Sequence, residues 1–211
     1  MLRRQHDCVI VANGAFPTRP DILEELKRSS CIIACDGAVN NLIAAGISPH
    51  HIVGDLDSVS DELRRQFSDI LFHNPDQETN DLTKAAEFAV EKGFKHPVIL
   101  GATGLREDHT LGNISLLTTY CRMFDTVRMV SDFGTFIPVT GTTTIECNAG
   151  QQVSLFAVFP FGSITTHGLR YPIRERKLPV WWEGTLNEAL NTSFTLELTG
   201  EGNVIVYLHH C

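Results

Sequence analysis

The sequence contains no run of basic residues, no Cys-x-x-Cys pair and no apolar segment of membrane-spanning length. Its net charge is −8, which argues against nucleic acid as a main partner. No segment approaches the ~20 consecutive apolar residues of a transmembrane helix, so we expect no membrane association and a cytoplasmic protein. The six cysteines have neither zinc-ligand nor disulfide spacing, and we interpret them as buried reduced thiols.

The first part of the chain alternates apolar, strand-like runs with helical periods. We expect strands at 7–12, 31–35, 51–53, 69–73, 97–100 and 126–130, and helices at 20–28, 38–45, 60–67, 79–92 and 108–123. Continuous apolar strands that alternate with helices predict a mostly parallel sheet covered on both faces. We therefore predict an α/β domain over residues 1–135.

The pattern changes near residue 134, where helical periods end and short strand-like runs begin. These runs cover residues 136–140, 143–147, 152–159, 163–168, 193–199 and 203–209, and Gly, Thr, Asn and Pro separate them. Such spacing predicts an antiparallel β-domain, a small sandwich or roll, over residues 136–211.

Five acids gather between Gly54 and Asp81, in or beside turns that follow apolar runs: Asp55, Asp57, Asp76, Glu78 and Asp81. Gathered carboxylates repel one another unless a positive group joins them, and Mg²⁺ prefers such oxygen ligands. The alternative is that these are solvated turns, as most Asp-rich loops are. The apolar Ile52-Val53 and the glycine before Asp55 favour a strand end instead.

Five residues directly or nearly follow predicted strands: Asp36, Asp55, Asp76, Gly101 and Asp132. The carboxyl ends of parallel strands meet at one edge of a sheet, where ligands bind. Asp57 lies two residues beyond Asp55 and can reach the same ion. Asp81 opens a helix, where it can also serve only the helix dipole.

A second feature is the small-residue loop Gly101 to Gly104, which opens a helix and offers backbone N–H groups to a phosphate. It is neither a P-loop nor a Gly-x-Gly-x-x-Gly loop, and a glycine turn without a ligand is an equal alternative. Arg106 can clamp a phosphate or remain an exposed arginine. Asp108 can act on a substrate or cap its helix.

In combination, these motifs resemble the thiamin pyrophosphokinase family. The resemblance rests on Gly54-Asp55-Leu56-Asp57-Ser58, on the segment from Asp76 to Ala85 and on the segment from Gly101 to Ile114. It implies a Rossmann-like α/β domain followed by a β-sandwich domain that takes part in thiamin binding. It also implies a homodimer with active sites at the interface, and transfer of a diphosphate from ATP to the hydroxyl of thiamin, giving thiamin diphosphate and AMP.

The resemblance also assigns residues by position. Asp55, Asp57 and Asp81 are expected to bind Mg²⁺, and Asp36 or Asp108 to accept the hydroxyl proton. The residues expected to bind ATP are Asn13, Asp76, Gln77, Thr79, Thr103, Gly104 and Arg106. Those expected to bind thiamin are Thr185 and Asn187, together with Trp181 and Trp182, which lie close by in sequence and can either stack on a heteroaromatic ring or serve core packing. Two positions depart from the family pattern. Tyr171 stands where an aromatic residue, often tryptophan, is usual, and Leu186 replaces a usual serine.

Two rival functions fit parts of the pattern. A metal-dependent phosphoesterase also places aspartates at strand ends, but it should carry more histidines near them than the pair Asp108-His109. A non-catalytic nucleotide sensor would need no dense group of acids.

Overall fold

The computed structural model describes residues 6–158 and 162–210, and the chain divides into two compact units, Met1–Asp132 and Phe133–Cys211. No helix in the described part is long and apolar enough to cross a membrane. Five cysteines are free, and Cys8, Cys31, Cys35 and Cys147 are buried as expected, whereas Cys121 is only half-buried. Cys211 and the end of the predicted strand at Phe159 lie outside the described residues.

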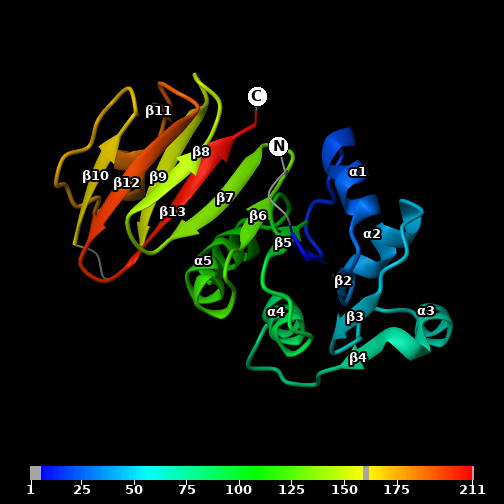
Figure 1. Ribbon diagram of the computed structural model, residues 1–211. Coiled ribbons are helices and arrows are strands. Elements are labelled where there is room, and N and C mark those ends of the chain that lie inside the picture. The colour runs from blue at the N-terminus through cyan, green and yellow to red at the C-terminus, as the bar shows by residue number, and fades with distance from the viewer. Residues whose placement is uncertain (1–5, 159–161, 211) are drawn as a thin grey trace. The chain divides into compact units, whose positions relative to one another are not determined.

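The first unit contains a six-stranded parallel sheet in the order β6-β5-β1-β2-β3-β4 (Figure 1). Its strands are β1 (Cys8–Val11), β2 (Ile32–Cys35), β3 (His51–Gly54), β4 (Leu71–His73), β5 (Pro97–Leu100) and β6 (Arg128–Val130). The predicted strand at 69–73 is wrong at its start, because Ser68–Ile70 form a short 3-10 helix, η1. Strands β1, β2 and β5 are fully buried, as their unbroken apolar sequences require.

Five helices cover the two faces of this sheet: α1 (Pro20–Arg28), α2 (Ala38–Ala44), α3 (Asp61–Gln66), α4 (Asp81–Glu91) and α5 (Glu107–Met123). Helices α1 and α2 share one apolar core with Val9, Val11 and Ile32. Alternate residues of a strand face opposite sides, so Ile10 and Ile33 face the side on which α4 contacts β1, β2 and β3. The side chain of Ser60 caps α3 by accepting a hydrogen bond from the N–H of Leu63.

The second unit is an antiparallel β-sandwich, which confirms the predicted fold class. One sheet has the order β11-β9-β13-β7 and the other the order β10-β12-β8. Their bounds are β7 (Gly134–Val139), β8 (Thr143–Glu146), β9 (Gln152–Val158), β10 (Ser163–His167), β11 (Asn187–Glu188), β12 (Ser193–Thr199) and β13 (Asn203–His209). A shared apolar core includes Leu155, Phe194 and Val206. The two-residue strand β11 and the 3-10 helix η2 (Trp181–Gly184) carry no periodic signal and are absent from the sequence prediction.

Candidate active site

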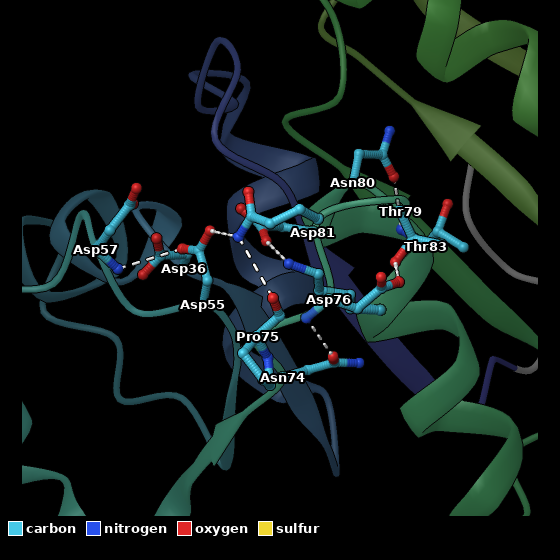
Figure 2. Close-up of polar contacts among 12 residues, drawn as sticks. Asp36, Asp55, Asp57, Asn74, Pro75, Asp76, Thr79, Asn80, Asp81 and Thr83 are labelled. Atoms are coloured by element: carbon cyan, nitrogen blue, oxygen red, sulfur yellow. Dashed lines mark hydrogen bonds and ion pairs between the residues drawn. The ribbon is translucent and has the colours of Figure 1, made fainter.

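Three acids meet at the carboxyl ends of β2 and β3. One carboxylate oxygen from each of Asp36, Asp55 and Asp57 lies within 4.8 Å of the others. Figure 2 shows Asp36 and Asp55 between Asp57 on one side and Asp81 on the other. The acid trio, as we call Asp36, Asp55 and Asp57, is thus brought together by strand topology from residues 21 positions apart in sequence.

The turn between Asp55 and Asp57 depends on an unusual residue. Leu56 has φ of 67°, in the left-handed region, which costs a non-glycine residue roughly 1–2 kcal/mol. Its side chain is only 9% exposed and packs into the core with α2, which returns roughly 1.5–3 kcal/mol. The backbone N–H of Asp57 donates to Oδ1 of Asp55 at 3.2 Å and closes the turn. Burial of Leu56 therefore holds the two carboxylates in one tight turn.

Asp36 carries a buried carboxylate with an unused oxygen. The residue is 2% exposed; its Oδ2 accepts a hydrogen bond of 3.1 Å from the backbone N–H of Ser58. Its Oδ1 is buried and has no hydrogen-bond partner among the described residues. Burial above all, with the neighbouring acids adding to it, raises the pKa of Asp36 to about 6. A buried acceptor of this kind fits a cation, so the donor set suits a metal ion.

Gly54 fixes the spacing between Asp36 and Asp81. A Cβ atom at Gly54 would lie 2.8 Å from Cβ of Asp36 and 3.2 Å from Oδ1 of Asp81, so a side chain there would displace both. Asp81 itself begins α4, and its Oδ1 lies 3.3 Å from Nζ of Lys84. Asp81, which the sequence predicts as the third metal ligand, therefore lies beside the acid trio, and Asp36 is the third acid of the trio itself.

The loop after β4 lies against the same acids. Asp76 accepts hydrogen bonds from the backbone N–H of Glu78 at 3.0 Å and from the hydroxyl of Thr79 at 2.7 Å, and these bonds lower its pKa. Nε2 of Gln77 donates to Oδ2 of Asp55 at 3.3 Å. Asn80 caps α4 by accepting from Thr83 N–H at 2.9 Å (Figure 2).

The loops after β1 and β5 meet where the strand order reverses direction, which is the usual ligand site of such sheets. The N–H of Gly14 donates to the carbonyl of Gly101 at 2.6 Å, and a Cβ at Gly14 would collide with that carbonyl. The carbonyl of Thr103 accepts from the N–H of Ala15 at 2.8 Å. Asn13 packs against Gly37 at the end of β2, so it lies on the side facing the acids.

Arg106 and Asp108 form an exposed pair at the start of α5. Nε and Nη2 of Arg106 lie 3.1 and 2.6 Å from the two carboxylate oxygens of Asp108. This pairing, together with the N–H of His109, lowers the pKa of Asp108 to about 2. Arg106, and not Asp108, occupies the N-cap position of α5, and its side chain makes no capping bond. Asp132 does not join the acid trio, because it accepts hydrogen bonds from Thr18 and Arg19.

The expected thiamin residues lie in the second unit, around η2 and β11. Trp181 donates from Nε1 to the carbonyl of Ala157 at 3.1 Å, whereas Trp182 is 71% exposed. The hydroxyl of Thr185 is engaged with the carbonyl of Trp182 at 2.8 Å. Leu186 has φ of 59° and is 75% exposed, so its backbone strain is not offset by burial.

Asn187 is buried, and its amide is committed to the backbone. Its Oδ1 accepts from the N–H groups of Tyr171 and Glu188, and its Nδ2 donates to the carbonyl of Tyr171 at 2.7 Å. Asn187 therefore holds the exposed Tyr171 segment in place.

Sequence reasoning missed two residues of this site, Ser58 and Lys84. Ser58 binds Asp36 through its N–H and Asp57 through its hydroxyl, at 2.9 Å. The available signal was its place directly after Asp57. Lys84 is 3% exposed, and the available signal was its spacing of four residues from Phe88, which places both side chains on one buried face of α4.

Family comparisons match both units. The model for "Thiamin pyrophosphokinase, catalytic domain" matches residues 22–130, and that for "Thiamin pyrophosphokinase, substrate-binding domain" matches residues 134–207.

Individual relatives and structures agree. A thiamine pyrophosphokinase of Bacillus subtilis is 27% identical over 172 residues, covering 78% of this chain and 80% of that protein. Thiamin pyrophosphokinase 1 of Caenorhabditis elegans is 26% identical over 160 residues, covering 69% and 65%. Among crystal structures, thiamine pyrophosphokinase from Bacillus subtilis superposes with a TM-score of 0.80 at 24% identity, covering 96% of this chain and 98% of that one. The enzyme from Geobacillus thermodenitrificans gives 0.79 at 25% identity, with 97% of each covered.

Proposed function

The chain belongs to the thiamin pyrophosphokinase family, and from this premise we propose how its residues carry out the reaction. The activity is the ATP-dependent transfer of a diphosphate to the hydroxyl of thiamin, giving thiamin diphosphate and AMP. The observation that carries the assignment of residues is the acid trio at the ends of β2 and β3, inside the segment matched to the catalytic domain. The rival function is that of a metal-dependent phosphoesterase, and the assay described below distinguishes it from diphosphate transfer.

We assign the metal to Asp55, Asp57 and Asp81, with Asp36 in the same cluster. The unused, buried Oδ1 of Asp36 supports a cation here, because an uncompensated buried carboxylate is costly. Mg²⁺, when bound, would offset the negative charge that ATP brings to the site. The protein's own part is positioning: Leu56 fixes the turn, and Gln77 and Ser58 orient the carboxylates of Asp55 and Asp36.

Asp36 and Asp108 are the two candidates for the base that accepts the proton of thiamin's hydroxyl, and they differ in the metal-free protein. A base works best when its pKa lies near the working pH. In the metal-free protein the pKa of Asp36 is raised to about 6, whereas Arg106 holds that of Asp108 at about 2. The bond that forms joins the hydroxyl oxygen to the β-phosphorus of ATP, the bond from that phosphorus to the oxygen bridging it to the α-phosphate breaks, and AMP leaves with that oxygen.

ATP is proposed to bind across the loops that follow β1, β4 and β5. The residues are Asn13, Asp76, Gln77, Thr79, Thr103, Gly104 and Arg106. Support comes from the direct bond between Gln77 and Asp55 and from the contact between Asn13 and Gly37, which tie these loops to the acid trio. Arg106 supplies an exposed guanidinium that can exchange Asp108 for a phosphate.

Thiamin is proposed to bind at Trp181, Trp182, Thr185 and Asn187. Trp182 offers an exposed ring to a heteroaromatic ligand, while Asn187 acts indirectly by holding Tyr171. The exposed apolar side chains Tyr171, Val180, Trp182 and Leu186 gather within this one segment, and we propose that a second copy covers them in a homodimer. A cytoplasmic location and the absence of nucleic-acid partners remain predictions.

The deciding experiment incubates the protein with Mg-ATP, with and without thiamin, and separates the nucleotides. Thiamin-dependent AMP together with thiamin diphosphate is the expected result. Phosphate release that ignores thiamin would indicate a phosphoesterase, and ADP as the product would contradict diphosphate transfer. Asp55→Asn serves as the inactive control.

A further inference from the structure

Lys84 is a charged residue at a buried position of α4, where an apolar side chain would be expected. Its side chain is 2% exposed, and its neighbours on α4 include the buried Ala85 and Phe88. Burying an ammonium without a partner costs several kcal/mol, so its surroundings must compensate it. The partner is Asp81, whose Oδ1 lies 3.3 Å from Nζ, three residues earlier on the same helix.

The charge of Lys84 also acts beyond Asp81. Hydrogen bonds from neighbouring groups lower the pKa of Asp55 and Asp76, and the positive charge of Lys84 adds to that lowering. The direct contact of the ammonium with the carboxylates of the site is the one with Asp81. Asp81 is the shared member, since it contacts Lys84 on one side and approaches Gly54 and Asp36 on the other.

We propose that Lys84 is the resident counter-charge of the acid cluster: its ammonium holds Asp81 in the metal-free protein, and a divalent cation takes over that compensation when it binds. Lys84 is then a positioning residue for the diphosphate transfer, and the inference rests on the metal site assigned above. Asp81 is kept in place between turnovers, and repulsion among the carboxylates does not open the site when the cation leaves.

This role has a counter-intuitive consequence. A resident positive charge competes with the incoming cation, so its removal should strengthen binding of the bare metal even as it loosens Asp81. For a unit charge acting on a divalent ion across part of the site, the Coulomb term corresponds to a change on the order of ten-fold. A lysine that served only to fill space would have no such effect.

The test measures binding of Mn²⁺ alone to nucleotide-free protein by calorimetry, in the wild type, Lys84→Met, Lys84→Arg and Lys92→Met. Lys92 lies at the other end of α4, and its removal changes the net charge by the same amount. We expect Lys84→Met to bind Mn²⁺ on the order of ten-fold more tightly, and Lys84→Arg and Lys92→Met to bind as the wild type does. In the AMP assay, Lys84→Met should lose kcat, and Lys84→Arg should restore part of it.

Equal or weaker Mn²⁺ binding in folded Lys84→Met would overturn this inference alone, because the AMP assay of the wild type is independent of it. No Mn²⁺ binding by the wild type would overturn it together with the metal assignment. If Lys84→Met does not fold, as judged by its helical circular dichroism, Lys84→Gln removes the same charge and keeps a donor.

Discussion

Replacing Asp36 by asparagine should stabilise the metal-free protein, and the gain should depend on pH. Asparagine has nearly the same shape, can accept the bond from Ser58, and carries no charge. The folded pKa of Asp36, about 6, lies above the ordinary value of 3.8, so the folded state favours the protonated form. Below the unfolded pKa the carboxyl is neutral in both states and costs nothing. As pH rises through the folded pKa, the ionised carboxylate becomes a penalty.

The size of this penalty follows from the shift. At about 1.36 kcal/mol per pKa unit, it approaches about 3 kcal/mol at pH 8 and is about 1 kcal/mol at pH 4.5. The gain from Asp36→Asn should therefore grow by about 2 kcal/mol between these pH values, or about 4–8 °C in Tm. Saturating Mg²⁺ should shrink the gain, because the cation then compensates the wild-type carboxylate.

The assay is thermal unfolding followed by circular dichroism at a helical wavelength, in EDTA and in Mg²⁺. All α-helices of the described residues lie in the first unit, so this signal reports the unit that contains Asp36. Asp61→Asn, on the exposed surface of α3, is the matched control and should shift stability by less than about 1 kcal/mol at either pH. If Asp36→Asn gave the same change at pH 4.5 and pH 8, or a loss at both, the argument from uncompensated burial would be refuted.

Four further outcomes are expected. Asp55→Asn should lower kcat by on the order of 10²-fold or more, and Asp61→Asn should leave turnover near that of the wild type; similar rates for both would remove Asp55 from the site. Trp182→Ala should raise KM for thiamin more than KM for ATP without loss of stability, because this ring is largely exposed. Asn187→Ala should raise KM for thiamin and also cost about 1–3 kcal/mol, since it strands backbone groups of Tyr171; an unchanged Tm would contradict that role. Sedimentation at micromolar concentration should show a dimer, and a monomer alone would count against the covered apolar segment.

The architecture of both units was predictable because each carries a periodic signal. Unbroken apolar runs such as Cys8–Val11 have few alternatives to a buried parallel strand, and the helix at Pro20–Arg28 has its proline where a helix begins. The prediction was wrong at residues 69–70, where the backbone turns in a 3-10 helix before β4. Strand β11 was missed because two residues are too few to show a period.

The site was predictable as far as topology alone determines it. Any parallel sheet brings the residues after β2 and β3 to one edge, so Asp36 and Asp55 could be placed there from sequence. What sequence could not supply is which carboxylate is buried and which is held by a partner. Asp36 becomes the third member of the acid trio because Gly54 lets it approach, and Asp81 stands beside it because Lys84 holds it.

Compensation of charge, more than the acids themselves, gives this site its order. Each carboxylate has a specific donor: Ser58 for Asp36, Gln77 for Asp55, and Lys84 for Asp81. These donors lie in different loops and on a helix, and their sequence positions follow no period. Such a set leaves one requirement unmet, the buried Oδ1 of Asp36, and a cation bound there would satisfy it. The metal-free fold thus holds its closely spaced acids in place through neutral donors and one lysine.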